Sequence, residues 1–227
     1  MSGSKKINFF VHGATGKMGQ NVLAILQRIK IVKCVDSLKL ANVCIDFSSP
    51  EGVDRLLRDL KGTQTALVSG TTGLSDEQFK KLKIESNRRA ILWSSNFSPG
   101  LWAVRSALKA FSAVADFDFT IDEIHHTEKK DNPSGTAITL HKDLEKAVGK
   151  KVDKPVGKRV GGVFGIHTIT AGSKNELIRL EHTAMNRIVF AQGAVDSALW
   201  IVNQSPGLYS MDEFMTKSAF NHLTTTS

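Results

Sequence analysis

Cysteine is scarce in this sequence of 227 residues, and long apolar runs are absent. The two cysteines, Cys34 and Cys44, lie in apolar runs without Cys-x-x-Cys spacing, which argues against a disulfide scaffold and a cysteine zinc site. No apolar run approaches the ~20 residues that span a bilayer, and no signal or transit peptide precedes the first strand-like run. We therefore expect a cytoplasmic protein, outside plant plastids, with no membrane partner.

Acidic residues are fewer than basic ones: 22 Asp and Glu stand against 30 Lys and Arg, which gives a net charge of +8. A basic protein can bind nucleic acid, but this charge equally suits an enzyme whose substrate and cofactor are both anions. The basic residues are scattered among acidic ones, and the nearest approach to a patch, Lys150, Lys151 and Lys154, has no interleaved aromatic residues. We therefore expect no nucleic-acid partner.

The first half of the chain alternates short apolar runs with amphipathic stretches. Strands are expected at residues 7–11, 31–35, 43–47, 65–68 and 90–93, and helices at 17–30, 50–60 and 75–83. Strands that alternate with helices indicate βαβ units and a parallel sheet covered on both faces. This part of the chain is predicted to be α/β, a Rossmann-like doubly wound domain.

The pattern changes after residue 99. A helix is expected at 101–115, then a strand with one wet face at 117–122, a helix at 135–148, strands at 163–171, 176–184 and 187–191, a helix at 194–202 and an amphipathic turn at 211–220. This pattern predicts an α+β substrate and oligomerisation domain with an open mixed sheet. We expect the dinucleotide-binding domain to comprise residues 1–97 and 187–227, and the second domain residues 98–186.

A glycine-rich loop follows the first strand and opens the first helix. Its glycines have distinct roles: Gly13 allows a tight turn, Gly16 lets the backbone approach a pyrophosphate, and Gly19 lets helix and strand pack closely. The helix N-terminus offers free N–H groups to phosphates, and an acid at the end of the second strand suits the ribose hydroxyls. The cofactor residues expected here are Gly13, Ala14, Thr15, Gly16, Lys17, Met18 and Asp36.

Two more loops are expected at the carboxyl ends of the fourth and fifth strands, where ligands bind in open α/β sheets. Small residues there let backbone groups reach the nicotinamide ribose, and Phe97 could pack on the nicotinamide ring. Gly73 is read as an ordinary turn residue. The cofactor residues expected in these loops are Gly70, Thr71, Thr72, Ser94, Ser95, Asn96 and Phe97.

The densest polar run of the chain is residues 123–137, which contains His125, His126, Lys129 and Lys130. Adjacent histidines seldom converge on one ion, and no third ligand has suitable spacing, since His167 and His182 cannot be placed from sequence. No metal is therefore expected. Ser134, Gly135 and Thr136 open a helix, and their hydroxyl and N–H groups suit a substrate carboxylate.

The run Glu-x-His-His-x-x-Lys-x-Asp-x-Pro-Ser-Gly-Thr-Ala resembles the signature of dihydrodipicolinate reductase, also called 4-hydroxy-tetrahydrodipicolinate reductase. Other blocks agree in order along nearly the whole chain: residues 13–19, 46–50, 70–73, 96–98, 165–167 and 182–194. The resemblance implies an enzyme that reduces 4-hydroxy-tetrahydrodipicolinate to tetrahydrodipicolinate with NADH or NADPH, on the diaminopimelate route to lysine. It also implies a homotetramer joined through the sheets of the second domain.

The resemblance assigns roles to individual residues. His125 and Lys129 become the candidate proton donors, and Arg187 joins the cofactor residues. His126, Lys129, Gly135 and Thr136 become the candidate substrate residues, in addition to Ser134 from the helix start. Histidine has an ordinary pKa of ~6.5, which suits a proton donor near neutrality, and the charge of Lys129 would stabilise electron density that arrives with hydride. Which of His125 and Lys129 delivers the proton stays open.

Cofactor preference depends on the end of the second strand. The carboxylate of Asp36 would accept hydrogen bonds from both ribose hydroxyls of NAD and would repel a 2′-phosphate. The resemblance implies that family members that use NADPH well tend to carry arginine at the next position, which is Ser37 here, although Lys33 or Lys39 could reach the phosphate. We expect NADH to be used at least as well as NADPH.

Three alternatives are weighed against this interpretation. A short-chain dehydrogenase or epimerase needs a Tyr-x-x-x-Lys pair, but the chain has one tyrosine, Tyr209, and Glu213 stands four residues after it. Another Rossmann-fold oxidoreductase that acts on a small dicarboxylate remains an alternative, as does a non-catalytic NAD-binding regulator.

Overall fold

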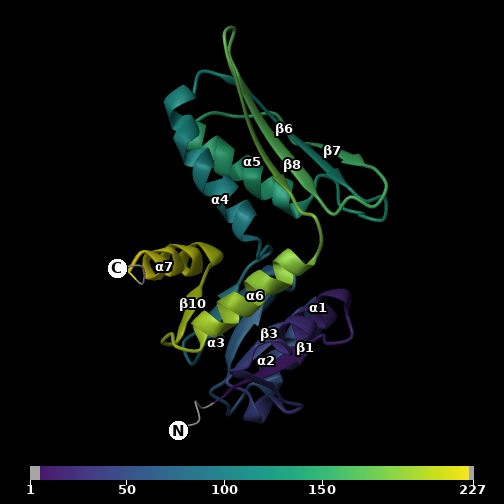
Figure 1. Ribbon diagram of the computed structural model, residues 1–227, viewed down its shortest axis with the longest axis vertical. Coiled ribbons are helices and arrows are strands. Elements are labelled where there is room, and N and C mark those ends of the chain that lie inside the picture. Colours follow the sequence, from purple (N-terminus) through teal and green to yellow (C-terminus); the bar gives the residue numbers. More distant parts are fainter. Residues whose placement is uncertain (1–5, 225–227) are drawn as a thin grey trace. The chain divides into compact units, whose positions relative to one another are not determined.

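The structure is a computed structural model that describes residues 6–224, with side chains to residue 217. The chain divides into two compact units: the first contains Met1–Phe97 and Ile188–Ser227, and the second contains Ser98–Arg187. The chain therefore leaves the first unit after Phe97 and returns to it at Ile188 (Figure 1). Each unit is described by itself below.

The first unit is built on a six-stranded sheet in the order β10-β5-β4-β3-β1-β2, and every pair of neighbours is parallel. The strands are β1 (Ile7–His12), β2 (Val32–Cys34), β3 (Val43–Asp46), β4 (Ala66–Ser69), β5 (Ala90–Trp93) and β10 (Gly207–Tyr209). The central strands β3 and β4 are buried along their whole length, as expected for a parallel sheet that is covered on both faces. The order is that of a doubly wound Rossmann-like fold.

Helices cover both faces of this sheet. They are α1 (Lys17–Leu26), α2 (Pro50–Asp59), α3 (Asp76–Glu85), α6 (Ile188–Ile201) and α7 (Met211–Thr224), with a short 3₁₀ helix η1 (Leu38–Leu40). One apolar core contains residues of α1, α6 and α7, and the other contains residues of α2 and α3. The start of α2 is fixed by Ser49, whose hydroxyl accepts from Gly52 N, and α3 begins with a reciprocal capping box between Ser75 and Gln78.

The strand predicted at residues 187–191 is wrong, because α6 begins at Ile188 (Figure 1). Their β-branched and aromatic side chains favour a strand locally. The buried residues of α6 include Ala191, Ala194, Val195, Ala198 and Ile201. This spacing of three and four residues lets one helical face pack on α1 and the sheet, and that packing overrides local propensity.

Several other element boundaries differ from the predictions. Helix α1 ends at Leu26 and not at residue 30, and the predicted helix 101–115 is divided into α4 (Pro99–Ala107) and the 3₁₀ helix η2 (Leu108–Val114). The predicted turn at 211–220 belongs to α7. Strands β7 (Val156–Arg159) and β10 were missed, because both are short and neither has an alternating apolar pattern.

The second unit is built on a four-stranded mixed sheet in the order β7-β6-β8-β9. Its strands besides β7 are β6 (Asp118–His125), β8 (Ile166–Gly172) and β9 (Leu177–Thr183), and β7 alone pairs in parallel. Helix α5 (Gly135–Val148), α4 and η2 pack on one face of the sheet through a core that includes Phe119, Ile121 and Ile169 (Figure 1). On the opposite face of β9 lie Arg179, Glu181 and Thr183, all exposed in the described chain.

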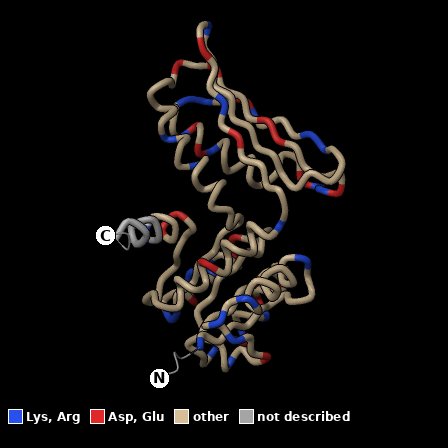
Figure 2. Tube along the Cα trace, viewed as in Figure 1, with Lys and Arg blue, Asp and Glu red and all other residues tan. Residues whose placement is uncertain are grey.

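Charged residues are distributed over both units. Figure 2 shows Lys and Arg on helices, strands and loops, interspersed with Asp and Glu. Within the part of the chain that the structure describes, no helix has the length and apolar character needed to cross a membrane.

Candidate active site

The glycine-rich loop of the first unit joins β1 to α1. Gly13 has a φ of +79°, a conformation that favours glycine, and Gly16 N donates to Gly13 O at 3.0 Å to close the turn. A Cβ on Gly19 would collide with the backbone of Gly13, so glycine there permits the close approach of helix and strand. In α1, whose first turn is described in full, that turn contains no acidic residue and its N-cap provides no side-chain hydrogen bond. Its N–H groups are therefore suited to an anion.

Behind this loop lies a buried carboxylate that sequence analysis did not assign a role. Asp46 ends β3 and is 0% exposed. Its Oδ1 accepts from His12 Nδ1 at 2.9 Å and from the Ser48 hydroxyl at 2.6 Å, while its Oδ2 accepts from the hydroxyls of Ser69 and Thr71, each at 2.8 Å. Burial raises the pKa of Asp46, but these hydrogen bonds outweigh it and hold the pKa below its ordinary value. One carboxylate thus joins the loops that follow β1, β3 and β4.

The other predicted cofactor residues differ in exposure. Asp36 follows β2 and is exposed, whereas Ser94 and Asn96 form a local turn in which Ser94 Oγ donates to Asn96 O at 2.6 Å. The expectation that Phe97 packs on a nicotinamide ring is not met: its side chain is 1% exposed and meets Phe47 edge to face, with ring centroids 5.9 Å apart. The apolar core takes this ring because burying an aromatic side chain is strongly favourable.

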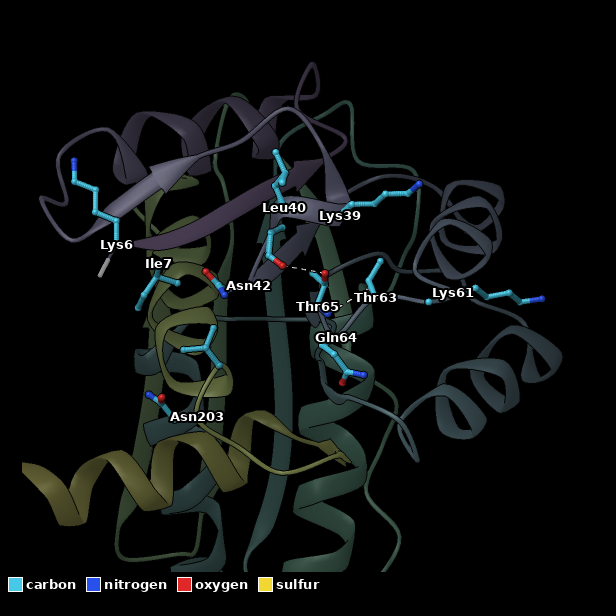
Figure 3. Close-up of a pocket in the computed structure, with 13 residues that line it drawn as sticks. Lys6, Ile7, Lys39, Leu40, Asn42, Lys61, Thr63, Gln64, Thr65 and Asn203 are labelled. Carbon is cyan, nitrogen blue, oxygen red and sulfur yellow. Dashed lines mark hydrogen bonds between the residues drawn. The ribbon is translucent and has the colours of Figure 1, made fainter. Parts of the chain in front are cut away.

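A cavity of about 700 Å³ lies at the other edge of the same sheet. Its lining includes Ile7, Asn42 and Thr65, which stand at the amino-terminal ends of β1, β3 and β4 (Figure 3). Lys39 lines this cavity, and Figure 3 shows the amine of Lys6 pointing away from those of Lys39 and Lys61. These amines do not converge on a ligand, and Lys39 faces the edge opposite the glycine-rich loop.

In the second unit, the functional residues gather where β6 ends and α5 begins. Glu123 and His125 both point inward from β6, and both are buried. The antiparallel register of β6 and β8 sets Glu123 opposite His167, whose ring is edge to face with that of His125 at a centroid distance of 5.0 Å. Oε2 of Glu123 lies 3.3 Å from Nδ1 of His125 and 3.5 Å from Nε2 of His167.

Ser134 does not offer its donors to a ligand, contrary to its predicted role in binding a substrate carboxylate. It is 1% exposed, its N–H donates to Glu123 Oε1 at 2.8 Å, and its hydroxyl donates to Oε2 of the same carboxylate. The hydroxyl also accepts from Ala137 N and so caps α5. Gly135 is exposed and Thr136 is half-buried, so both lie where a ligand can approach the first turn of α5.

Arg159 at the end of β7 connects this cluster to the preceding loop. It donates to Glu123 Oε1 at 3.2 Å, to Lys129 O at 3.2 Å and to Asp131 O. Lys129 Nζ lies 2.8 Å from Asp131 Oδ1. The loop that contains the predicted catalytic lysine is therefore held by a cation that sequence analysis did not select.

Burial determines the protonation of these imidazoles. It lowers the pKa of His125, helped by Lys129 and Arg159, although Glu123 opposes the shift. It lowers the pKa of His167 to about 4, with a further contribution from His125. Burial raises the pKa of Glu123, but the bonds from Ser134, with His125 and Arg159, outweigh it and keep the pKa below its ordinary value.

The cluster also has the geometry of a metal site. One ligand atom each from Glu123, His125 and His167 lies within 4.8 Å of the others, so the third ligand that spacing could not supply comes from β8. The same carboxylate, however, already contacts the Arg159 guanidinium and accepts from Ser134. A bound cation would have to share the carboxylate with a fixed positive charge.

Sequence analysis missed Glu123, Arg159 and His167 as members of this site. The signal for Glu123 was available: in the alternating pattern of β6 it shares the inward face with Ile121 and His125, and a buried acid requires partners. For Arg159 no sequence signal was available, and His167 stood out only in the block 165–167 that agrees with the family, since both places depend on strand register. Arg187, predicted to bind the cofactor, lies 5.1 Å from the centroid of the Phe164 ring within the second unit.

Comparisons with known proteins identify the family. The family described as "Dihydrodipicolinate reductase, C-terminus" matches residues 101–215, and "Dihydrodipicolinate reductase, N-terminus" matches residues 28–97. The 4-hydroxy-tetrahydrodipicolinate reductase of Bdellovibrio bacteriovorus is 46% identical over 222 residues, which cover 93% of this chain and 97% of that protein. The enzyme of the same name from Rickettsia akari is 36% identical over 239 residues, which cover 93% of this chain and 98% of that protein.

The fold agrees with this assignment. The solved structure of dipicolinate-bound dihydrodipicolinate reductase from Paenisporosarcina sp. TG-14 is similar with a TM-score of 0.73 at 20% sequence identity, over 90% of this chain and 97% of that one. The predicted Rossmann-like sheet with a second mixed sheet is confirmed, as is the predicted reductase activity. The chain is an NAD(P)H-dependent oxidoreductase of the diaminopimelate route to lysine, and it belongs to the 4-hydroxy-tetrahydrodipicolinate (dihydrodipicolinate) reductase family.

Proposed function

We propose that the two units divide the ligands of this reduction between them. The loops of the first unit at Gly13–Gly19, Gly70–Thr72 and Ser94–Asn96 hold the pyridine nucleotide, with the pyrophosphate at the N-terminus of α1. The second unit holds the dicarboxylate substrate beside His126, Lys129 and the first turn of α5. Arg187, on the segment that returns to the first unit, is a further cofactor residue in this proposal.

One observation carries the substrate site: a carboxylate already lies at the start of α5. Asp131 is bound by the amine of Lys129 at 2.8 Å and by the backbone of Gly135. Burial raises the pKa of Asp131, but these contacts outweigh it and keep the pKa below its ordinary value. An amine and a helix N-terminus that stabilise one carboxylate there are suited to a substrate carboxylate, with Thr136 as a neighbouring donor.

Loss of the 4-hydroxyl group of the substrate as water would give a conjugated imine, and a bound pyridine nucleotide would supply hydride to it. The electron pair displaced by the hydride moves onto an enamine carbon, which must take one proton for the reaction to balance. His125, at the end of β6, and Lys129, four residues later, are the candidate donors. The charge of Lys129 also stabilises the substrate carboxylate and the electron density that arrives with the hydride.

NADH is proposed to serve at least as well as NADPH. Asp36 is exposed at the end of β2, where a carboxylate binds ribose hydroxyls and repels a 2′-phosphate, and Ser37 carries no charge. Lys33 remains available to a phosphate on the exposed surface of β2, whereas Lys39 lines the cavity at the opposite edge.

The second unit is proposed to form a homotetramer through the face of its sheet away from α5. On that face, Thr168 Oγ1 donates to Glu181 Oε2 at 3.1 Å, and Arg179 stands beside Thr170 in the register of β8 and β9. An exposed sheet face of this kind becomes protected in a symmetric assembly. A cytoplasmic location agrees with a biosynthetic reductase whose cysteines are both free.

A coupled assay tests the proposal. The substrate is prepared freshly with its synthase, and consumption of NADH is followed together with binding of 2,6-pyridinedicarboxylate, a planar dianion. Thr136→Val is expected to weaken binding of this dianion and leave NADH affinity unchanged, because Thr136 contributes only to the second unit. Equal loss of both ligands would show that the dianion site is placed wrongly. Light scattering tests the tetramer, and a monomer at assay concentration would contradict it.

A further inference from the structure

Glu123 is a buried charge that the reaction described above does not use. It is 1% exposed, and yet it keeps a pKa below its ordinary value, because its partners stabilise the ionised carboxylate despite burial. A buried, ionised carboxylate without partners is strongly destabilising. The groups that contact its two oxygens are therefore the ones that offset the cost of burying its charge.

The two oxygens face different surroundings. Oε1 accepts from the N–H of Ser134 at 2.8 Å and from Arg159 at 3.2 Å, and these are fixed donors from α5 and β7. Oε2 accepts from the hydroxyl of Ser134 and faces the imidazoles of His125 and His167. One oxygen thus anchors the carboxylate, and the other presents negative charge to the imidazoles.

The imidazole of His125 has two nitrogens in contrasting positions. Nδ1 is fully buried and lies 3.3 Å from Oε2, and among the described residues it has no hydrogen bond of good geometry. Catalytic hydrogen bonds are often poorly aligned before ligands bind and tighten in the complex. Nε2 is on the other side of the ring, beside Gly165, where a Cβ would lie 3.0 Å from it. The backbone of Gly165 does not require glycine, since its φ is outside the left-handed region.

We propose that Glu123 is a positioning residue for the reduction, which holds His125 through Nδ1 so that Nε2 faces the reacting carbon, and that Gly165 keeps the Nε2 edge of the ring clear. A carboxylate on one nitrogen fixes both the tautomer and the orientation of an imidazole. This inference rests on the proposed role of His125 as the proton donor.

A divalent cation bound by Glu123, His125 and His167 is the competing interpretation of the same cluster. Arg159 argues against it, because its guanidinium lies 3.2 Å from the carboxylate that the cation would need. A cation on Oε2 would also compete with the hydroxyl of Ser134 for that oxygen. The experiment includes this possibility as an outcome that would overturn the proposal.

The first test compares Glu123→Gln with Asp118→Asn, a matched loss of charge at an exposed position of the same strand. We expect kcat of E123Q to fall about 10²-fold, the lower end of what a general acid contributes, while NADH affinity is unchanged. The descending alkaline limb of the kcat–pH profile should move to lower pH, since Glu123 raises the pKa of His125. D118N should change neither kcat nor the position of the alkaline limb. The groups that face His125 and share in its titration are Glu123, Lys129, Asp131, Arg159 and His167.

The second test leaves the carboxylate in place. Gly165→Ala adds a methyl group against Nε2, whereas Gly162→Ala adds one where nothing lies within 4 Å. We expect G165A to lose kcat at least 10-fold, with normal NADH affinity and cooperative thermal unfolding, and G162A to match the wild type. If E123Q does not fold, the kcat of G165A alone tests whether the orientation of His125 matters for the reduction.

Three results would overturn the proposal: wild-type kcat in G165A, an unmoved pH profile in folded E123Q, or turnover that is lost with EDTA and restored by Zn²⁺. If the wild-type enzyme reduces its substrate while His125→Ala keeps full kcat, the assignment of His125 as donor fails. If H125A is slow and both E123Q and G165A are normal, only the present inference fails.

Discussion

Asp46 in the first unit and Glu123 in the second are carboxylates with at most 1% exposure, and the two have different partners. Asp46 of the first unit is held by hydroxyl groups of Ser48, Ser69 and Thr71, together with His12. Glu123 of the second unit is held by a guanidinium and a helix N-terminus, and it faces two imidazoles. Both carboxylates keep a pKa below the ordinary value despite burial.

The difference lies in what each carboxylate controls. The partners of Asp46 are the last residues of β1 and β4 and two residues of the loops that follow β3 and β4, so the carboxylate fixes these strand ends and loops relative to one another. The partners of Glu123 other than Ser134 titrate or carry charge, so this carboxylate controls protonation within one cluster. A buried acid surrounded by hydroxyls is therefore expected to influence ligand affinity, and one surrounded by imidazoles to influence rate and pH dependence.

The largest expected effect is on rate in the second unit. Lys129→Ala should lower kcat by roughly 10²–10⁴-fold, because it removes a candidate proton donor and the charge beside the developing electron density. NADH affinity should not change. Lys130→Ala, which removes an exposed lysine from the same loop, serves as the control. Steady-state kinetics of both variants decide the matter, and near-normal kcat in K129A would remove this loop from the mechanism.

The next largest effect concerns pH and stability. His167 has its pKa lowered to about 4 in the folded protein against an ordinary 6.5, so the unfolded chain binds the proton more readily. The free energy of unfolding is therefore unaffected by this group above pH 6.5. It falls by about 3 kcal/mol as the pH is lowered from 6.5 towards 4, because the unfolded chain is protonated first. The loss should be confined to the second unit and should be much reduced in His167→Gln.

Urea unfolding measures this effect with a local probe. Trp102 belongs to the second unit, whereas Trp93 and Trp200 belong to the first. Replacing the latter two with Phe leaves a fluorescence signal from the second unit alone. An unfolding free energy that depends on pH to the same extent in this background and in the same background with H167Q would contradict the prediction.

A smaller effect is expected at the other carboxylate. Asp46→Asn removes the charge that accepts hydrogen bonds from the surrounding hydroxyls. We expect NADH affinity to fall about 10-fold, which is the effect of losing one hydrogen bond to a charged group. Affinity for 2,6-pyridinedicarboxylate should stay level, because the dianion is proposed to bind the second unit. Asp59→Asn, at an exposed end of α2, is the control in parallel fluorescence titrations. Loss of dianion affinity in D46N would show that the two carboxylates are not separate in function.

The smallest effect tests the position of Lys39. Because Lys39 lines the cavity at the amino-terminal edge of the sheet, Lys39→Ala should leave the ratio of kcat/KM for NADH and NADPH unchanged. Ser37→Arg, next to Asp36, should raise the use of NADPH, since a guanidinium binds phosphate well. Kinetics with both cofactors at one ionic strength measure the ratio. A ratio altered by K39A would place Lys39 at the cofactor after all.

The same contrast explains how much could be predicted from the sequence. Strand 90–93 and helix 135–148 were predicted with the bounds that the structure has, because local periodicity determines them. The carboxyl ends of parallel strands meet at one edge, so the loops near Asp46 could be grouped before their contacts were known. The role of Asp46 itself could not be predicted, because it depends on hydrogen bonds between segments that are far apart in the sequence.

The cluster around Glu123 was less predictable. Its members come from β6, β7, β8 and the start of α5, and they meet only through the register that pairs Glu123 with His167 and His125 with Arg159. A shift of one residue would send these side chains to the other face of the sheet. Ser134 was predicted to bind a substrate carboxylate because it lies at a helix N-terminus. It binds the carboxylate of Glu123 instead, and that pairing depends on the same strand register.

The path of the chain determines the order in which this protein can be completed on the ribosome. Domains fold as units while synthesis proceeds from the N-terminus. The second unit, Ser98–Arg187, is an uninterrupted segment, whereas the sheet of the first unit gains its final strand only at Gly207–Tyr209. Helix α6 packs on one face of β3, β4 and β5, and it is made only after the second unit. Until then, that face of the sheet lacks α6. The unit whose synthesis begins first is therefore the last to be finished, and its apolar face is exposed to chaperones and aggregation for as long as residues 98–187 take to be made.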